Sequence, residues 1–456
     1  MDSSQNTPRP GRWRRCAALA ASLLLITMLL AVLAVPGPAV RQYPQRIPVR
    51  LWHMWTAEWK VVVDRIVQRF NESQDRYELI ALSVPSASAD SKFLLAVAGG
   101  DPPDVMAQWN QVIPKWAESG LIVPLDELMT PAEREAFERD AYPIARKIGT
   151  YKGRPYGITT GLNTWACYYL PQHLREAGLD PDHFPDTLEE LVAWGDKLHR
   201  FDRHGNLVRL GFMPEWFTMY APVFGKGFYD EATGAVTIDT LENLRALTFL
   251  VDCRRKLGFE NVVRFRSGLS TGFAAEWPFI SGAYSITLDG QWRVEQLARY
   301  APNLEYRTAP LPPPQGGRSR AGWSNGNFMI IPRGAAQPAG AFEFIKFWSG
   351  LANPQRAAEF YTWGGWLPLR RAIADAPVYR QYVRKHPPFQ TFVDLLPSEN
   401  LQPTPPVPYQ VYLWDRIGQI DDSAMRGTLT PAEALRTLRE DIELEQAQRR
   451  ALGYAD

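Results

Sequence analysis

One alternating series of strand-like and helix-like segments constrains the fold more than any other feature of the sequence. Residues 49–55 form an apolar run that predicts a strand, and residues 57–71 follow with apolar side chains at helical spacing. A second strand is predicted at 77–84, a short helix at 92–98 and a third strand at 104–107. A chain that alternates strand and helix in this way builds a mainly parallel sheet covered by helices, so the sequence predicts an α/β fold.

A further junction between a strand and a helix lies downstream, at residues 281–294. Apolar side chains alternate along its first half, which predicts a strand, and the residues from Gln291 onward follow helical spacing. Asp289, Gly290 and Trp292 therefore stand where a strand ends and a helix begins. Open α/β sheets bind ligands outside the carboxyl ends of their strands, so this junction is a candidate binding position.

Length and composition exclude several classes of protein. The 456 residues are enough for two domains, and 45% hydrophobic with 22% charged residues is typical of a globular protein. The 50 Lys and Arg residues are balanced by 49 Asp and Glu residues, so no basic excess is present to bind nucleic acid. The 16 tryptophans supply more flat, amphipathic surface than a core usually needs. Cys167 and Cys253 are expected to be small buried thiols, although an oxidising compartment would permit a disulfide between them.

Residues 1–40 carry the pattern of an export segment. Arg9, Arg12, Arg14 and Arg15 precede an apolar run over residues 16–35. The run is longer than the apolar core of a cleaved signal, about 7–15 residues, and long enough to span a bilayer, which takes ~20. Its basic flank predicts that the amino terminus stays in the cytoplasm and the remainder is exported. Both a cleaved signal and an uncleaved anchor are compatible with this pattern. Cys16 precedes the run, so it is not the cysteine that follows a lipoprotein signal.

Four stretches, taken in order, resemble the extracellular solute-binding proteins of ABC importers, in the maltose-binding-protein-like, carbohydrate-specific branch of family 1. They are FLLAVAGGDPPDV at 93–105, KGRPYGI at 152–158, GAYSITLDGQW at 282–292 and GGWLPLR at 364–370. The resemblance covers about residues 48–450, with the motifs in the order in which the family has them.

This resemblance implies a two-lobed periplasmic-binding-protein fold of type II, in which each lobe is a mainly parallel sheet flanked by helices. The lobes are expected to close on a sugar about a hinge. The first lobe is expected to comprise residues 48–157 and 288–335, and the second residues 158–287 and 336–456. The resemblance also implies a monomer without catalytic activity, metal or other cofactor, which delivers a sugar to the permease subunits of an ABC importer. The expected location is the periplasm or the outer face of the bacterial cytoplasmic membrane.

A sugar-binding cleft needs aromatic plates for the C–H faces of the sugar and polar side chains that pair with its hydroxyls. Residues of these types occur in turns after predicted strands and in the junction described above. The candidate ligand-binding residues are Trp55, Gln108, Trp109, Asn110, Asn163, Trp216, Asp289, Trp292, Trp323, Asn325, Trp363, Trp366 and Arg370. For residues 108–110 and for Asn163, the resemblance itself implies a ligand contact.

Several of these candidates have an equally simple structural interpretation. Asp289 is placed to cap the helix that follows it, a common role for aspartate. Trp216 lies in an aromatic loop and is compatible with a core, lid or binding position. Arg370 is compatible with bidentate hydrogen bonds to a ligand and with a surface salt bridge.

Two alternative functions compete with capture of a neutral sugar. Residues 268–272 fit the G-x-S-x-G pattern of a hydrolase, which requires a preceding strand, a following helix and a downstream histidine; only His386 follows. A secreted carbohydrate-active hydrolase is therefore an alternative, although no zinc, P-loop or dinucleotide-binding motif occurs. The other alternative is a binder of glycerol phosphodiester or glycerol-3-phosphate, whose phosphate would meet Arg370 or Lys226. A tethered sensory receptor with the same binding fold would need a separate signalling partner.

Overall fold

The computed structural model describes residues 41–269 and 274–454. Contacts divide the chain into two units, Met1–Ile47 and Pro48–Asp456, and the described secondary structure begins at the border between them. The predicted signal or anchor within residues 1–40 lies outside the described residues. In the described part of the chain, no helix is long and apolar enough to cross a membrane.

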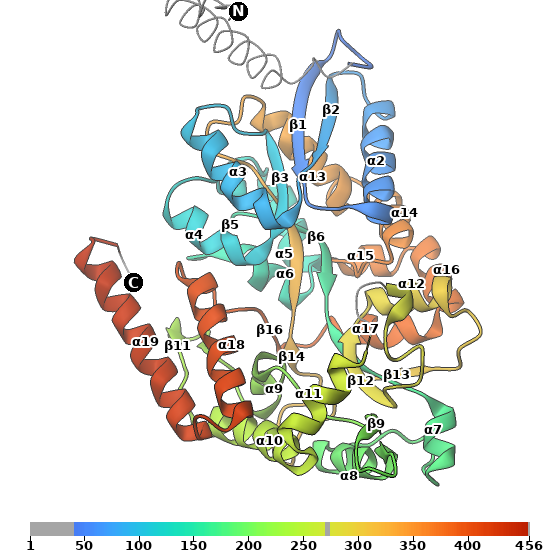
Figure 1. The fold of residues 1–456 in the computed structure, drawn as a ribbon. Coiled ribbons are helices and arrows are strands. Elements are labelled where there is room, and N and C mark those ends of the chain that lie inside the picture. The colour runs from blue at the N-terminus through green and yellow to red at the C-terminus, as the bar shows by residue number, and fades with distance from the viewer. Residues whose placement is uncertain (1–40, 270–273, 455–456) are drawn as a thin grey trace, which may run out of the picture. The chain divides into compact units, whose positions relative to one another are not determined.

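The first sheet has five strands in the order β2-β1-β3-β15-β6 (Figure 1). Leu51 and Val105 are partners in the parallel pairing of β1 with β3, whereas β15 runs antiparallel to both β3 and β6. The strands are β1 (Ile47–His53), β2 (Tyr77–Ser83), β3 (Val105–Trp109), β6 (Ile158–Asn163) and β15 (Asn325–Ile330). The helices nearest to them in sequence are α2 (Ala57–Glu72), α3 (Ser86–Ala98), α4 (Ile113–Glu118), α5 (Pro131–Asp140) and α6 (Pro143–Gly149).

The alternating series predicted for this part of the chain is confirmed. α2 buries Val63, Ile66 and Phe70 on one face, as the helical spacing indicates. α3 starts at Ser86, before the predicted start at residue 92, because its first turns are polar and carry no apolar periodicity.

The second sheet has three strands in the order β12-β7-β13. They are β7 (Trp165–Tyr169), β12 (Ile286–Gly290) and β13 (Arg307–Ala309). Both pairings in this sheet are antiparallel, so the prediction of a mainly parallel sheet in each lobe is wrong here. A parallel neighbour requires a helical crossover within the same sheet. Instead β7 follows β6 after Thr164 alone, and the chain passes from one sheet directly into the other.

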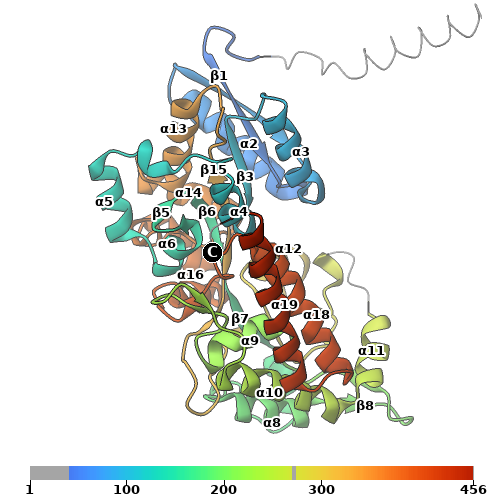
Figure 2. The same cartoon turned by 90° about the vertical axis from the view of Figure 1, so that its left-hand side faces the viewer.

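Helices surround the second sheet, and α18 and α19 lie side by side in both views (Figures 1 and 2). These helices are α7 (Pro171–Glu176), α8 (Leu188–Leu198), α9 (Phe217–Phe224), α10 (Leu241–Leu257), α11 (Phe259–Ser267), α18 (Gln410–Arg426) and α19 (Pro431–Ala451). Short strand pairs complete the structure: β4 (Thr150–Tyr151) with β5 (Arg154–Pro155), β8 (Arg200–Phe201) with β9 (Leu207–Arg209), β10 (Tyr229–Asp230) with β11 (Ala235–Val236), and β14 (Gly322–Trp323) with β16 (Leu401–Gln402).

Two large hydrophobic cores accompany the two sheets. The first contains Val49 of β1 together with Phe342 and Phe360, so α13 (Pro338–Ser349) and α14 (Pro354–Gly364) pack with the first sheet. The sequence-based division assigns both helices to the second lobe, which differs from this packing. The helices α15 (Arg371–Ala374), α16 (Pro377–Lys385) and α17 (Gln390–Leu395) also contribute to the first core. The second core contains Ile286 of β12 and Leu435 of α19.

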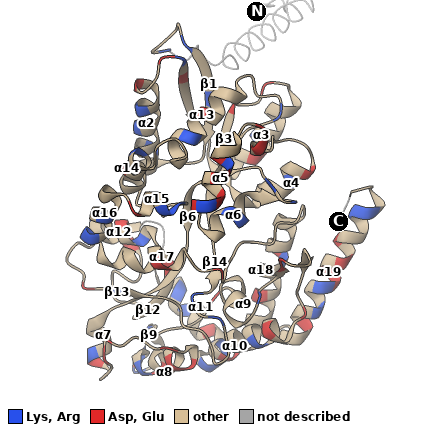
Figure 3. Ribbon diagram, turned by 180° about the vertical axis from the view of Figure 1, so that it is seen from behind, with Lys and Arg blue, Asp and Glu red and all other residues tan. Residues whose placement is uncertain are grey.

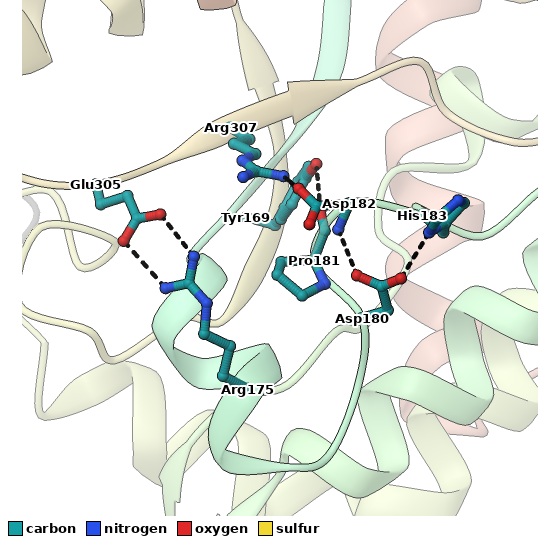
Figure 4. A network of polar contacts seen from close by, with 8 residues as sticks. All are labelled: Tyr169, Arg175, Asp180, Pro181, Asp182, His183, Glu305 and Arg307. Carbon is teal, nitrogen blue, oxygen red and sulfur yellow. Dashed lines mark hydrogen bonds and ion pairs between the residues drawn. The ribbon is translucent and has the colours of Figure 1, made fainter.

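A polar network fixes the turn after α7 against β13 (Figure 4). Arg307 Nη1 donates to the Pro181 carbonyl oxygen at 2.9 Å, and the Tyr169 hydroxyl donates to the same oxygen at 3.2 Å. Arg175 makes two hydrogen bonds to the Glu305 carboxylate, at 2.9 and 3.1 Å. These groups join the second sheet to its neighbouring turn, so the network has a structural role.

Charged residues of both signs are distributed along the outer helices, as the blue and red segments of α10 and α19 show in Figure 3. Many form pairs one helical turn apart, such as Lys60 with Asp64 and Arg426 with Asp422. Exposed ion pairs of this kind contribute little to stability. Because each pair joins a positive and a negative residue, these helices carry charges of both signs.

Candidate functional site

Side chains at the ends of β6, β12 and β15 are linked by buried hydrogen bonds. Asn163 Nδ2 donates to Asn325 Oδ1 at 2.8 Å, and Gln291 Nε2 donates to Asn163 Oδ1 at 2.7 Å. The Ser324 hydroxyl donates to the Asn163 carbonyl oxygen at 2.6 Å, and the Thr164 amide donates to Gln291 Oε1 at 3.3 Å. This network fixes the orientation of the Asn163 amide where the chain passes between the sheets.

A cavity of about 510 Å³ lies beside this network. Its walls come from the β1–α2 turn, β3, β6, residues 274–278, α12 (Trp292–Tyr300), β15 and the end of α14. The tryptophans that line it are Trp55, Trp59, Trp109, Trp277, Trp292 and Trp366. The polar lining residues are Thr56, Ser86, Asn163, Gln291, Gln296 and Asn327. Among the described lining residues, Arg293 is the only one that carries a charge.

Packing holds several of these indoles in place. Trp55 stacks on Trp348 with ring centroids 5.4 Å apart and an interplanar angle of 18°. Trp366 stacks on the same residue at 5.4 Å and 22°. Trp109, by contrast, is 37% exposed and faces solvent at the end of β3. The cavity therefore combines indoles that packing holds in place with the more exposed indole of Trp109.

The guanidinium of Arg293 is fixed by three contacts. Its Nε donates to Asp289 Oδ2 at 2.9 Å, its Nη1 donates to Gln296 Oε1 at 2.9 Å, and it lies 4.4 Å from the centre of the Trp277 ring. Asp289 also accepts a 2.8 Å hydrogen bond from the Gly290 amide. Burial raises the pKa of the Asp289 carboxyl, and the charge of Arg293 opposes this shift. Asp289 thus holds a cavity residue without itself lining the cavity.

The structure brings five of the predicted binding residues together around the cavity: Trp55, Trp109, Asn163, Trp292 and Trp366. Other candidates lie behind its walls. Gln108 is buried and donates to Asp90 at 2.7 Å, whereas Asn110 accepts a 3.4 Å hydrogen bond from the Gly326 amide. Asn325 supports Asn163 from the same buried position. For all of these residues, contact with a ligand stays a prediction.

Two predicted residues are buried away from the cavity, Trp323 in the second hydrophobic core and Arg370 in an internal ion pair. Trp323 is buried, stacks on Trp414 at 4.6 Å and donates through Nε1 to a threonine hydroxyl at 3.1 Å. Arg370 is also buried, where its Nε lies 2.9 Å from Asp140 Oδ2 and its Nη1 donates to the Gly350 carbonyl oxygen at 2.6 Å. The ion pair expected at the surface is therefore internal, and it fixes the turn after α14.

The two remaining candidates also lie outside this cavity. Trp216 precedes α9, is 54% exposed and adopts a φ of 60°, which is unusual for a residue other than glycine. Trp363 lines a small recess beside the cavity, and the Arg65 guanidinium lies 3.7 Å from the centre of its ring.

Several residues that line the cavity are not among those predicted from the sequence. Gln291 and Arg293 flank the predicted Trp292, so the junction at the end of β12 offered a signal for them. Trp59 lies on one face of the helix predicted at 57–71, and helical spacing does not show that this face meets a cavity; Trp277 lies in a segment without periodicity. For Asn327, the alternation of side chains along β15 predicts the face of the sheet on which it lies, but not which residues pack over that face.

The hydrolase motif lacks its expected context. Helix α11 ends at Ser267, so a helix rather than a strand precedes Gly268, and Ser270 lies outside the described residues. Within residues 41–269 and 274–454, no group of three or more His, Cys, Asp or Glu side chains is arranged to hold a metal ion.

A protein-family model described as "Bacterial extracellular solute-binding protein" matches residues 65–387. A maltotriose-binding protein of Pyrococcus abyssi (strain GE5 / Orsay) is 22% identical over 318 residues, 69% of this chain, and the match spans 62% of that relative's length. The sn-glycerol-3-phosphate-binding periplasmic protein UgpB of Escherichia coli (strain K12) is 22% identical over 453 residues, which cover 92% of this chain and 94% of that protein.

Solved structures of sugar-binding proteins share the fold. CpMnBP1 with mannotriose bound is 25% identical and superposes with a TM-score of 0.74, covering 87% of this chain and 99% of that one. The sugar-binding protein MalE from Xanthomonas citri is 22% identical with a TM-score of 0.74, covering 90% of this chain and all of that one. The α/β architecture described above thus matches these proteins over most of its length.

Proposed function

The chain belongs to the bacterial extracellular solute-binding protein family, and from that premise we propose that it captures an oligosaccharide or a glycoside in the tryptophan-lined cavity. The family is non-enzymatic, so the cavity binds its ligand without converting it. The bound sugar then passes to the membrane permease of an ABC importer.

The lining of the cavity is the observation that carries this proposal. Six indoles offer flat surfaces for the C–H faces of sugar rings, and four amide side chains offer donors and acceptors for hydroxyls. A cavity of about 510 Å³ is within the usual range for small-molecule sites, roughly 300–1,000 Å³. The bound solutes named for the P. abyssi and CpMnBP1 relatives, maltotriose and mannotriose, are of the proposed class.

The second candidate ligand is sn-glycerol-3-phosphate or a glycerol phosphodiester. The full-length match to UgpB favours it, and Arg293 is a cation within the cavity. However, the Asp289 carboxylate lies 2.9 Å from the Arg293 guanidinium and balances its charge. A phosphate placed there would meet an ion pair rather than an uncompensated cation, so we favour the neutral sugar.

We also propose that the chain forms two lobes that close on the ligand by a hinge motion. The hydrogen bonds among Asn163, Gln291 and Asn325 support a hinge beside the cavity, because the chain crosses between sheets there. The two cores support placing residues 338–395 with the first lobe. An extracellular location follows for the lobes if residues 1–40 act as a cleaved signal or as an anchor.

Isothermal titration calorimetry tests the proposed function. We would titrate the full-length chain, purified in a mild detergent, with mannose and maltose oligosaccharides and separately with sn-glycerol-3-phosphate. A saturable heat with an oligosaccharide supports the proposal, and thermal unfolding adds a check, since ligand at a hundred times Kd stabilises the fold by ~2.7 kcal/mol. Binding of the phosphate ester without binding of any sugar would reject the proposal in favour of the second candidate.

A further inference from the structure

We propose that a bound oligosaccharide extends from the main cavity into the recess that Trp363 lines. The protein would then bind linear oligosaccharides with one end of the chain open to solvent. This inference rests on the proposed function and adds a subsite to it. The recess lies between α2, α12 and the end of α14. It makes use of Trp363, a predicted binding residue that the main cavity does not include.

The recess is continuous with the main cavity. Trp59, Gln296 and Gly364 line both spaces. The indole Nε1 of Trp59 lies 3.4 Å from the Gly364 carbonyl oxygen, to which it donates, and this contact joins α2 to the end of α14. A sugar chain that follows the wall of the cavity past Trp59 therefore enters the recess directly.

Aromatic surface is available in the recess for one more sugar ring. The Arg65 guanidinium lies 3.7 Å from the centre of the Trp363 ring and covers part of that ring. Arg65 does not line the recess, so the part of the Trp363 ring that faces the recess is not covered by Arg65. Tyr300, at the end of α12, lies on the same recess and is 43% exposed. Stacking on such surfaces is tolerant of the exact sugar, because it uses the C–H face of the ring.

Polar groups on the recess remain available for hydroxyls. Glu58 and Arg299 line it, and neither has a hydrogen-bond or ion-pair partner in the described ranges 41–269 and 274–454. The carboxylate of Glu295, which also lines the recess, accepts a hydrogen bond from the Tyr382 hydroxyl and is held in position by it. A donor and acceptors thus surround the aromatic surface, as a sugar subsite requires.

The size of the recess determines how far the ligand is enclosed. The recess holds about 50 Å³, against about 510 Å³ for the main cavity, so it supports one face of a sugar ring without closing around it. The far side of that ring faces water. Additional sugar units beyond it then meet no wall, and chains longer than the cavity are accepted.

Calorimetry with oligosaccharides of increasing length tests this inference. The full-length chain in mild detergent is titrated with malto- and manno-oligosaccharides of two to six units. We expect Kd to fall at least fivefold when the chain becomes long enough to reach the recess, with no loss of affinity for the hexasaccharide. Trp363→Ala and Tyr300→Ala should each remove most of this gain and leave disaccharide affinity unchanged, whereas Trp363→Phe should keep it.

The outcomes separate this inference from the proposed function. Tyr412→Ala, at an exposed tyrosine on α18 outside the recess, is the matched control and should retain the gain with length. A gain that survives in both recess variants, no gain with length, or weaker binding of the hexasaccharide would overturn the open subsite while sugar binding stands. If no oligosaccharide of any length binds, the proposed function fails as well. Should Trp363→Ala fail to fold, the exposed Tyr300→Ala variant decides.

Discussion

Asp289 Oδ2 accepts a hydrogen bond from Arg293 Nε at 2.9 Å, although only the arginine lines the cavity. The Asp289 side chain is 16% exposed and the Arg293 side chain 21%, so both are largely withdrawn from water. The pair therefore sets both the charge of the cavity and the direction in which Arg293 presents its remaining N–H groups. For a ligand-binding cavity, this makes Asp289 a positioning residue.

Asp289→Asn should weaken binding and lower stability. The substitution keeps the shape of the side chain and removes the charge that balances Arg293, so we expect Kd for a neutral oligosaccharide to rise about tenfold, roughly 1.4 kcal/mol. The free energy of unfolding should fall by about 1–3 kcal/mol, less than for a fully buried pair because some exposure remains. Calorimetry and urea denaturation measure the two effects. Asp252→Asn, in the exposed pair with Arg255, is the matched control and should change neither.

Trp109→Ala should reduce sugar affinity with little effect on folding. Trp109 lines the cavity and is 37% exposed, so its removal deletes a stacking surface without opening a core. We expect a loss on the order of 1–3 kcal/mol in binding, similar to the burial of one large side chain. Trp216→Ala is the control, because Trp216 is 54% exposed and lies outside the cavity. Equal losses in both variants would reject this cavity as the binding site.

The strands β1, β2 and β3 of the first sheet were predictable because their signals are local, whereas the antiparallel pairing of β15 with β3 and β6 spans more than 150 residues. Helical spacing in α2 and apolar runs in β1 and β3 need no knowledge of distant residues. The second sheet was not, because β7, β12 and β13 pair across more than a hundred residues and their direction depends on how the chain crosses between sheets. Periodicity identifies a strand and its faces, but it does not identify the strand's neighbours.

The site was partly predictable for the same reason. Trp55 and Trp292 stand at the ends of strands, where α/β folds place ligands, and the sequence identifies those ends. Trp59 is not predictable as a lining residue, because helical spacing identifies the face of the helix on which it lies but not the cavity that this face meets. The sequence leaves both a ligand contact and a surface salt bridge open for Arg370, because its partner, Asp140, lies far away in the sequence and only the folded chain brings the two together.

Arg370→Met should separate stability from binding. Arg370 is 6% exposed and holds Asp140 and the Gly350 carbonyl oxygen, so its loss leaves buried acceptors without a partner. We expect the free energy of unfolding to fall by about 3 kcal/mol. Sugar affinity, measured by calorimetry below the unfolding temperature, should remain within about twofold, since Arg370 does not line the cavity. A large loss of affinity in a stable Arg370→Met variant would restore Arg370 to the ligand contacts.

Asp421 should make the stability of the protein depend on pH. Its carboxylate, on α18, accepts a 3.1 Å hydrogen bond from the Phe217 amide at the start of α9. The pKa of Asp421 is raised from 3.8 to about 6, mainly by burial and also by the charge of the neighbouring Asp422, whereas the Phe217 amide and Arg254 oppose the shift. Because the folded state holds this proton more tightly than the unfolded state, the contribution to stability is complete below pH 4 and is lost as the pH rises through 6.

Asp421→Asn removes that dependence, because an amide oxygen still accepts from Phe217 and carries no charge to desolvate. A pKa raised by about two units corresponds to about 3 kcal/mol, so the variant should be more stable than the parent by up to that amount at pH 8. Urea denaturation at pH 4 and pH 8 measures the difference, which should disappear at the lower pH. Asp415→Asn, at an exposed carboxylate on the same helix, is the control and should show no such gain. Parallel pH profiles for Asp421→Asn and the parent chain would contradict the buried, protonated state of this carboxyl at acid pH.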